Sequence, residues 1–150
     1  MAAIENHVVR ELVALEGDAS CADAARLMTE RGIGSVAVRE GGRITGMVTE
    51  RDLVMRVLAD GASPDLPVRR AMRTDLPHVS PSTSEVECTA LMRDHTTRHL
   101  LVEEHGDVVG IISMRDVIRL MLDEKEWLIG QLQTFIDGRD FPRASAGSPL

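Results

Sequence analysis

A seven-residue motif carrying hydroxyl, guanidinium and carboxylate groups occurs twice in this chain of 150 residues. The first copy, GMVTERD, spans residues 46–52, and the second, GIISMRD, spans residues 110–116. Both contain a glycine, a hydroxyl residue three positions later, and an Arg-Asp pair two and three positions beyond the hydroxyl. The same offset of 64 positions relates residues outside the motif, such as Leu27 and Leu91. Two copies indicate a paired module rather than a long array of repeats.

The chemistry that these groups suit is the binding of a phosphate beside a diol. Each motif leads into a predicted helix, whose N-terminus offers unpaired N–H groups and a partial positive charge. Asp52 and Asp116 would repel a phosphate, but a carboxylate accepts hydrogen bonds from a ribose diol. The remaining groups would donate to phosphate: Thr49 and Arg51 in the first copy, Ser113 and Arg115 in the second. Phosphate donors beside a diol acceptor indicate a nucleotide site.

A structural interpretation of the motif has to be weighed against this one. A hydroxyl residue caps a helix, and an acidic residue in the first turn complements the helix dipole. One copy alone would therefore be explained as an ordinary junction between a strand and a helix. Because both copies have the same groups in the same register, a functional role is favoured.

The elements that must position the motifs recur in the order strand, helix, strand, strand, helix. Ser20 with Asp23 predicts a capped helix start, and Gly32 predicts the end of that helix. For the first copy we predict strands at 13–15, 34–39 and 44–48 and helices at 21–31 and 50–59. For the second copy we predict a strand starting at Val79, a helix at 85–94, strands at 99–103 and 108–112, and a helix from Met114. The fold class is therefore α/β, with two β-α-β-β-α repeats.

The repeats are too small to fold well alone, so we expect them to pack as one module with pseudo-twofold symmetry. The predicted boundaries are repeat 1 at 8–61, a Gly- and Pro-containing connector at 62–75 with a short helical turn at 67–72, repeat 2 with a C-terminal helical extension at 76–137, and a disordered tail at 138–150. The extension has apolar residues at three- and four-residue steps: Trp127, Leu128, Leu132, Phe135 and Ile136. This stripe packs either on its own module or on a second chain, and the sequence leaves both interpretations open.

Composition excludes several classes of function. The net charge is −7 and there is no Lys/Arg-rich run, which argues against nucleic-acid and anionic-membrane binding. No stretch is apolar enough to span a membrane, and the N-terminus lacks the pattern of a signal peptide, so we expect a cytoplasmic location. Cys21 and Cys88 have no CxxC spacing and are expected to be reduced thiols.

The chain resembles tandem cystathionine-β-synthase (CBS) domain proteins, or Bateman modules, and in particular the short stand-alone bacterial members. The resemblance rests on the element order, on both motifs, on residues 98–102 (RHLLV) and on residues 68–72 before the second copy. It implies a homodimer of modules and adenine-nucleotide binding in clefts between the repeats. By position, Asp52 and Asp116 would hold ribose hydroxyls. Contacts to ribose and phosphate would come from Thr49, Ser113, Arg51 and Arg115.

The chain departs from the family pattern at two places. Leu101 stands where the family often has proline. The first copy has Gly34 and Ser35 where the second has Arg98 and His99, the positions that face phosphate in relatives. We therefore expect Arg98 and His99 to contact phosphate and the two clefts to be unequal. A metal site is not expected, because no Cys or carboxylate completes a set with His95, His99 and His105.

The resemblance implies a non-enzymatic regulatory sensor with AMP as the first candidate ligand and no required cofactor. ADP, ATP, NAD(H) and S-adenosylmethionine also contain adenosine and remain open, as does an unidentified protein target. An enzyme is not expected, since the chain has no Ser-His-Asp order, Cys-His pair or Walker-type glycine loop. A structural adaptor with vestigial ligand sites is the remaining alternative.

Overall fold

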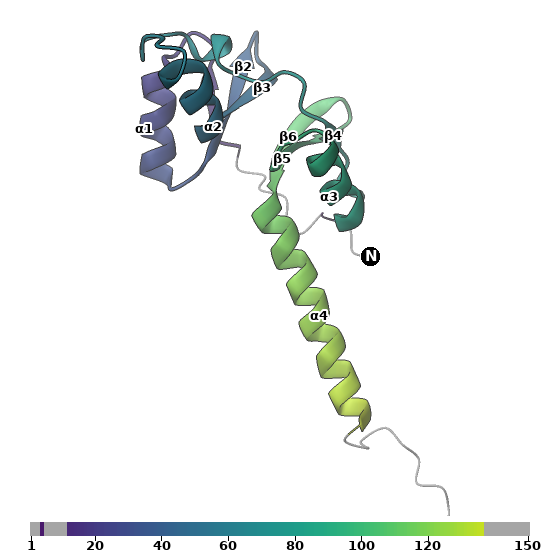
Figure 1. The fold of residues 1–150 in the computed structure, drawn as a ribbon. Coiled ribbons are helices and arrows are strands. Elements are labelled where there is room, and N and C mark those ends of the chain that lie inside the picture. Colours follow the sequence, from purple (N-terminus) through teal and green to yellow (C-terminus); the bar gives the residue numbers. More distant parts are fainter. Residues whose placement is uncertain (1–3, 5–11, 137–150) are drawn as a thin grey trace, which may run out of the picture.

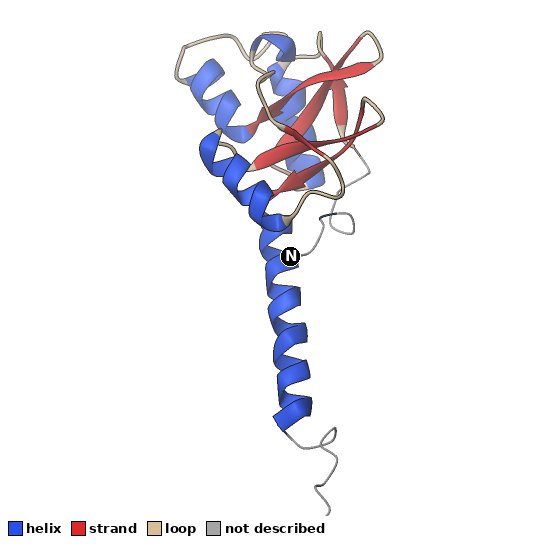
Figure 2. Ribbon diagram, turned by 90° about the vertical axis from the view of Figure 1, so that its right-hand side faces the viewer, coloured by secondary structure: helices blue, strands red, loops and turns tan. Residues whose placement is uncertain are grey.

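Two three-stranded sheets, each flanked by helices, form the module (Figures 1 and 2). The computed structural model describes Ile4 and residues 12–136. The first repeat contains β1 (Ala14–Glu16), α1 (Cys21–Arg31), β2 (Ser35–Glu40), β3 (Arg43–Thr49) and α2 (Glu50–Leu53), which continues as a π-helix (Val54–Leu58). The second contains β4 (His78–Val79), α3 (Glu85–Asp94), β5 (His99–Glu104), β6 (Asp107–Ser113) and α4 (Met114–Ile136). The predicted α/β fold with two β-α-β-β-α repeats is confirmed.

The strand registers are the same in both repeats. The first strand of each sheet is parallel to the second, and the second is antiparallel to the third. Ser35 lies opposite Thr49 in the first sheet, and His99 lies opposite Ser113 in the second. Each motif hydroxyl therefore sits at the edge of its sheet beside the first residue of the preceding strand. Ser35 and His99, which differ between the repeats, therefore lie next to the hydroxyl residues Thr49 and Ser113, which both repeats share.

Local capping signals set the helix ends as predicted. Ser20 and Asp23 form a reciprocal capping box at the start of α1, and Gly32 ends the helix in the left-handed conformation with φ of 62°. Ser84 and Glu87 form the same box at the start of α3. The predicted helix at 50–59 is helical, but its second half is wider than an α-helix. There the N–H of Ala59 donates to the carbonyl of Val54 at 2.8 Å, across five residues, which satisfies a carbonyl at the end of this short helix.

The core is aliphatic, since the chain has only one Trp, two Phe and no Tyr. Each repeat has its own buried cluster, with Val36, Val38 and Val48 central in the first and Leu100, Val102 and Ile112 in the second. A third cluster joins the two sheets and contains Met47, Leu76 and Leu101. The repeats thus share buried surface, as expected for units of this size. Both cysteines are buried, and burial together with two glutamates raises the pKa of Cys88 to about 11.

The connector packs against the first repeat. The predicted short helical turn is present as a 3-10 turn (Val68–Arg70), with Val68 buried in the first core cluster. Farther along, Arg73 and Met47 exchange both backbone hydrogen bonds, at 2.8 and 3.0 Å. This bridge extends the sheet edge of the first repeat and brings the connector to the boundary between the two repeats.

The long helix α4 leaves the module after its first two turns (Figure 1). Val117 and Leu120 are buried in the second core cluster, but Trp127 is 68% exposed and Ile136 is 77% exposed. The interpretation that the distal stripe packs back on its own module is therefore wrong. The helix is uninterrupted by proline and about 34 Å long, so it cannot turn back onto so small a module. The predicted disordered tail lies outside the described residues. Within the described part of the chain, no helix combines the length and apolar character that crossing a membrane requires.

Candidate functional site

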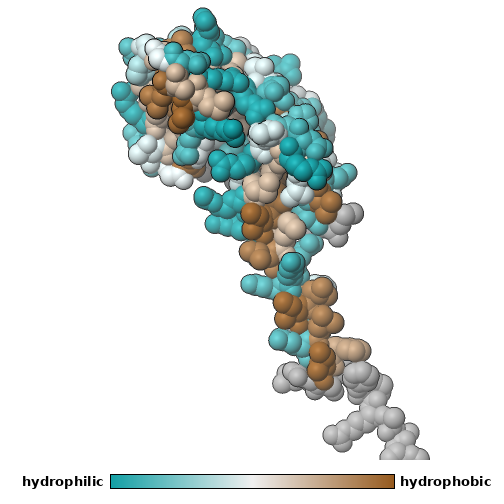
Figure 3. Space-filling view, in the orientation of Figure 1, coloured by the Kyte–Doolittle hydropathy of each residue, from teal (hydrophilic) through white to brown (hydrophobic). Residues whose placement is uncertain are grey.

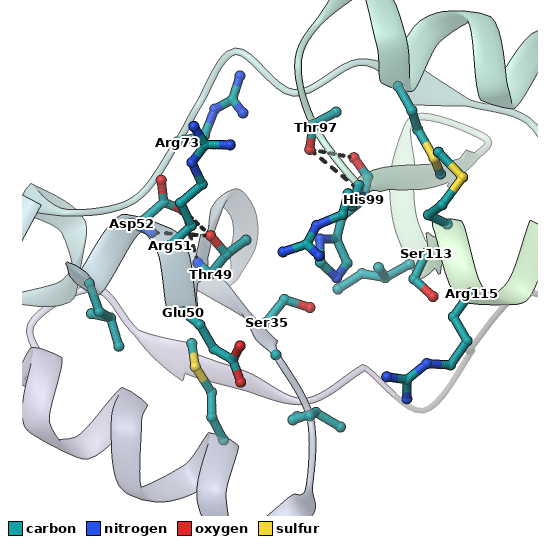
Figure 4. A pocket seen from close by; sticks show the side chains of 18 of the residues that line it. Ser35, Thr49, Glu50, Arg51, Asp52, Arg73, Thr97, His99, Ser113 and Arg115 are labelled. Carbon is teal, nitrogen blue, oxygen red and sulfur yellow. Dashed lines mark hydrogen bonds between the residues drawn. The ribbon is translucent and has the colours of Figure 1, made fainter. Parts of the chain in front are cut away.

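A cleft of about 1620 Å³ runs between the two repeats (Figure 4). Both copies of the repeated motif open into it, because the sheet edges that carry them face each other. All eight residues predicted for the site line this cleft: Thr49, Arg51, Asp52, Arg98, His99, Ser113, Arg115 and Asp116. The two predicted clefts correspond to the two halves of this cleft, with one motif in each half.

The hydroxyl and carboxylate of each motif are tied together by a helix cap. The Thr49 hydroxyl accepts from the N–H of Asp52 at 3.2 Å and donates to Oδ2 of Asp52 at 2.9 Å. The backbone N–H of Thr49 donates to the same Oδ2 at 2.9 Å. Ser113 and Asp116 repeat this arrangement. The structural interpretation is therefore correct as far as it goes, since both motifs cap their helices.

The cap leaves one oxygen of each carboxylate for another partner. Both aspartates use Oδ2 for the cap, and among the described residues neither Oδ1 accepts a hydrogen bond. Asp52 is only 6% exposed yet lines the cleft. The hydroxyl protons of Thr49 and Ser113 point to the aspartates, so these hydroxyls are engaged rather than poised to donate to a phosphate. The cap thus orients each carboxylate for an incoming donor such as a ribose hydroxyl.

His99 occupies the region where the two halves of the cleft meet. Its backbone N–H donates to the hydroxyl of buried Thr97 at 3.2 Å, and that hydroxyl donates to the carbonyl of His99 at 3.1 Å. Burial, with a smaller effect of the neighbouring Arg98, lowers the pKa of His99. The carboxylates of Asp116, Asp52 and Glu50 act in the opposite direction. Since these come from both repeats, His99 faces both halves of the cleft.

The two halves differ in charge at a second pair of positions, which sequence reasoning missed. The N–H of Glu50 donates to the carbonyl of Gly34 at 3.1 Å, and the N–H of Met114 donates to the carbonyl of Arg98 at 2.8 Å. Because these two bonds are equivalent, Glu50 of the first repeat and Met114 of the second occupy equivalent positions. The Glu50 carboxylate lies beside Gly34, because a Cβ added there would be 3.5 Å from its carboxyl carbon. The first half therefore has a carboxylate next to a glycine where the second has a thioether next to an arginine.

Arg73 is a further site residue that the sequence did not reveal. Its guanidinium donates to both oxygens of Asp75 at 3.1 and 3.2 Å, and to the carbonyl of His95 at 3.3 Å in the second repeat. The pKa of Arg73 is raised, mainly by its hydrogen bond to Asp75 and to a smaller extent by the charge of Asp52. Arg73 thus links the connector to both halves of the cleft. Its position in a stretch that reads as a linker offered no signal of this role.

The cleft concentrates positive charge in an acidic protein. Among the described residues, seven arginines line it together with four carboxylates, whereas the whole chain has a net charge of −7. A cleft lined by an excess of one sign raises the local concentration of ligands of the opposite sign. The described residues contain no group of three or more His, Cys, Asp or Glu side chains placed to hold a metal ion. The excess of arginine suits an anion, and the carboxylate oxygens outside the caps suit a hydrogen-bond donor.

Comparison with known proteins identifies two matches to the CBS domain family, at residues 4–59 and 68–123. The CBS domain-containing protein YhcV of Bacillus subtilis is 28% identical over 117 residues, covering 78% of this chain and 84% of YhcV. The chain spans a smaller share, 58% to 62%, of three other curated relatives.

Solved structures agree in fold. One from Burkholderia ambifaria, named as a signal-transduction protein with CBS domains, is 36% identical with a TM-score of 0.73 and covers 76% of this chain and 85% of its own. A conserved protein from Pyrococcus horikoshii is 31% identical with a TM-score of 0.75 and covers 80% and 92%.

Proposed function

Because the chain belongs to the CBS-domain family as a tandem pair of CBS repeats, we propose that it is a regulatory module that binds an adenosine-containing nucleotide in the cleft. One observation carries the proposal. Each motif aspartate has Oδ2 bound in a helix cap and Oδ1 without a hydrogen bond from the described residues, in a cleft rich in arginine. A ribose diol fits the aspartates, and a phosphate fits the arginines.

AMP is the ligand that we place first. A mononucleotide needs one aspartate for its ribose and one cluster of cations for its phosphate, and the second half of the cleft offers both. Asp116 would hold the ribose, with Ser113 orienting it. Arg98, His99 and Arg115 would contact the phosphate. ADP, ATP and S-adenosylmethionine contain the same adenosine and stay candidates on this basis.

A dinucleotide such as NAD(H) is the second candidate, and the continuity of the cleft favours it. NAD(H) contains two riboses joined by a diphosphate. Asp52 and Asp116 would each take one ribose, while His99 and Arg98 lie where the halves meet and suit the diphosphate between them. This would use both motifs for a single ligand, whereas AMP would bind once or twice per chain.

We propose no catalytic activity. The hydroxyls of Thr49 and Ser113 and the carboxylates of Asp52 and Asp116 bond to each other in helix caps, which is the structural role of these groups. A structural adaptor with vestigial sites remains the alternative, with an unidentified protein as its target. It is less favoured, because both carboxylates and the cations of the cleft are present.

We further propose a homodimer of modules. Exposed apolar residues occur at equivalent positions of the two repeats: Val54 and Leu58 in the first, Ile118 and Leu122 in the second. Exposed apolar patches that are repeated by pseudo-symmetry suit a self-complementary contact with a second copy.

Mass spectrometry of small molecules released from the denatured protein tests the proposal directly. Adding the ribonucleotide should then raise the melting temperature of the protein, because a ligand that binds only the native state stabilises it. The 2′-deoxy form should bind about 5- to 150-fold more weakly, since a buried carboxylate left unpaired costs about 1–3 kcal/mol. Equal shifts for both forms would remove the role given to Asp52 and Asp116. No shift with any of the candidate nucleotides would favour the adaptor.

A further inference from the structure

The distal half of α4, residues 125–136, is a large apolar surface with no part in the cleft. It extends about 18 Å beyond the module (Figure 1). Figure 3 shows hydrophobic patches along it, alternating with hydrophilic ones. Leu128, Ile129 and Leu132 are each 52% to 53% exposed. Helices in proteins owe most of their stability to the packing of an apolar face. A covering partner would supply that packing here.

The exposed residues follow a seven-residue repeat that starts inside the module. Three positions of the repeat are involved: Ile118, Lys125 and Leu132 at the first, Met121, Leu128 and Phe135 at the fourth, Leu122, Ile129 and Ile136 at the fifth. Lys125 is the one polar residue among these nine. Trp127 belongs to another face of the helix, because it lies about 200° around the axis from Lys125. A repeat of this period is typical of helices that pack along one another, so the partner should itself be a helix.

A second copy of α4 is the partner that fits. The stripe is continuous with Ile118 and Leu122 of the proposed dimer surface, so it extends that contact outward from the module. Charge is also compatible with pairing between copies. Lys125 interrupts the apolar stripe and Glu124 adjoins it, so Lys125 of one copy can meet Glu124 of the other. A single polar residue in such a stripe specifies the pairing at a cost in stability.

The charge of this segment disfavours a membrane surface. Amphipathic helices that lie on membranes carry Lys and Arg on the polar face, and anionic lipids attract basic segments. Here Asp123, Glu124 and Glu126 surround the single Lys125, so the segment is acidic. We propose that α4 pairs with α4 of a second copy of this chain through the stripe from Ile118 to Ile136. This rests on the homodimer of the proposed function and assigns it a second contact.

The test measures self-association of the full chain by sedimentation over a wide dilution range. Leu132→Glu places a charge in the stripe, and Gln133→Glu places the same charge one residue away on a polar face. Glutamate is a good helix former, so both variants should keep the helix, and circular dichroism checks this. We expect Leu132→Glu to weaken association at least about tenfold, or about 1.4 kcal/mol, and Gln133→Glu to leave it unchanged.

Three outcomes would overturn the proposal. One is equal association of Leu132→Glu and the unmodified chain. Another is a dimer that survives Leu132→Glu but is lost in Leu58→Glu, which would confine the contact to the module. The third is an unmodified chain that stays monomeric, with or without binding to anionic vesicles. Nucleotide thermal shifts on the same variants separate this test from the proposed function, because Leu132 does not line the cleft. If nucleotides do not raise the melting temperature but Leu132→Glu still weakens association, the proposed nucleotide binding fails and the helix pairing stands.

Discussion

Gly46 lies directly against the backbone of Arg73, so that a Cβ at position 46 would be 2.5 Å from the Arg73 carbonyl oxygen. The neighbouring Met47 exchanges both backbone hydrogen bonds with Arg73. The glycine of the first motif therefore has a packing role: it lets the connector return along β3. This return carries the Arg73 guanidinium to the boundary between the repeats. A residue type that looked like part of a ligand motif thus serves to assemble the cleft.

Gly46→Ala should lower the free energy of unfolding by about 1–3 kcal/mol, because backbone on both sides must move to admit the methyl group. Denaturant unfolding measures this. Gly130→Ala is the matched control. It lies in α4 with nothing within 4 Å of an added Cβ, and alanine is the better helix former by about 0.5–1 kcal/mol. If both variants unfold at the same denaturant concentration, the contact with Arg73 does not constrain position 46.

Arg98→Ala should reduce the difference in AMP affinity between the two halves of the cleft. Calorimetry of the unmodified chain should give one tight site per chain or two clearly unequal ones. The variant should lose about 1.5–3 kcal/mol at the tighter site, the value of a charge-assisted hydrogen bond, and added salt should weaken that site more. Arg26→Ala, in an exposed pair with Asp23, is the control. Two identical sites that are unchanged in Arg98→Ala would mean that the phosphate lies elsewhere.

Glu50→Gln should strengthen the binding of anionic ligands in the first half by up to about tenfold. The carboxylate lies in the cleft beside Gly34 and would repel a phosphate there, and glutamine has nearly the same shape without the charge. Titrations with AMP and with uncharged adenosine separate an effect of charge from an effect of shape. Removing the charge should strengthen the binding of AMP and leave the binding of adenosine unchanged. Glu30→Gln, on the exposed face of α1, controls for net charge. A gain for adenosine as large as that for AMP would contradict a charge effect.

Stability should fall as the pH drops below about 6.5, in part because of His99. Burial and Arg98 lower the pKa of His99 in the folded protein from the ordinary value of 6.5, and the facing carboxylates Asp116, Asp52 and Glu50 only partly oppose this. Between the two pKa values the unfolded chain binds the proton more readily, so protonation favours unfolding. Above 6.5 the imidazole is neutral in both states and contributes nothing.

His99→Gln should therefore make the unfolding free energy less dependent on pH below 6.5 and leave the slope above it unchanged. Denaturant unfolding at several pH values measures the slope. The same substitution at the exposed His95 serves as the control. If His99→Gln and the unmodified chain lose stability in parallel below pH 6.5, His99 is not the group that responds.

Much of the fold follows from neighbours in the sequence. The helices α1 and α3 begin and end at the predicted residues, because Ser20, Gly32 and Ser84 act through hydrogen bonds within a few residues of themselves. The internal repeat then transfers each assignment from one half of the chain to the other. The same repeat placed the six motif residues in one cleft, since equivalent motifs at the edges of two packed sheets face each other.

Tertiary structure decided what depends on residues far apart in the chain. The sequence alone determined that the chain has two β-α-β-β-α repeats with paired motifs. It did not reveal Arg73, which reaches the cleft only because its backbone pairs with Met47, or the place of Glu50 beside Gly34. It also left both interpretations of α4 open, because an apolar stripe has the same spacing whether it packs on its own module or not. The direction in which a straight helix leaves its sheet depends on the packing of Val117 and Leu120, which only the folded chain defines.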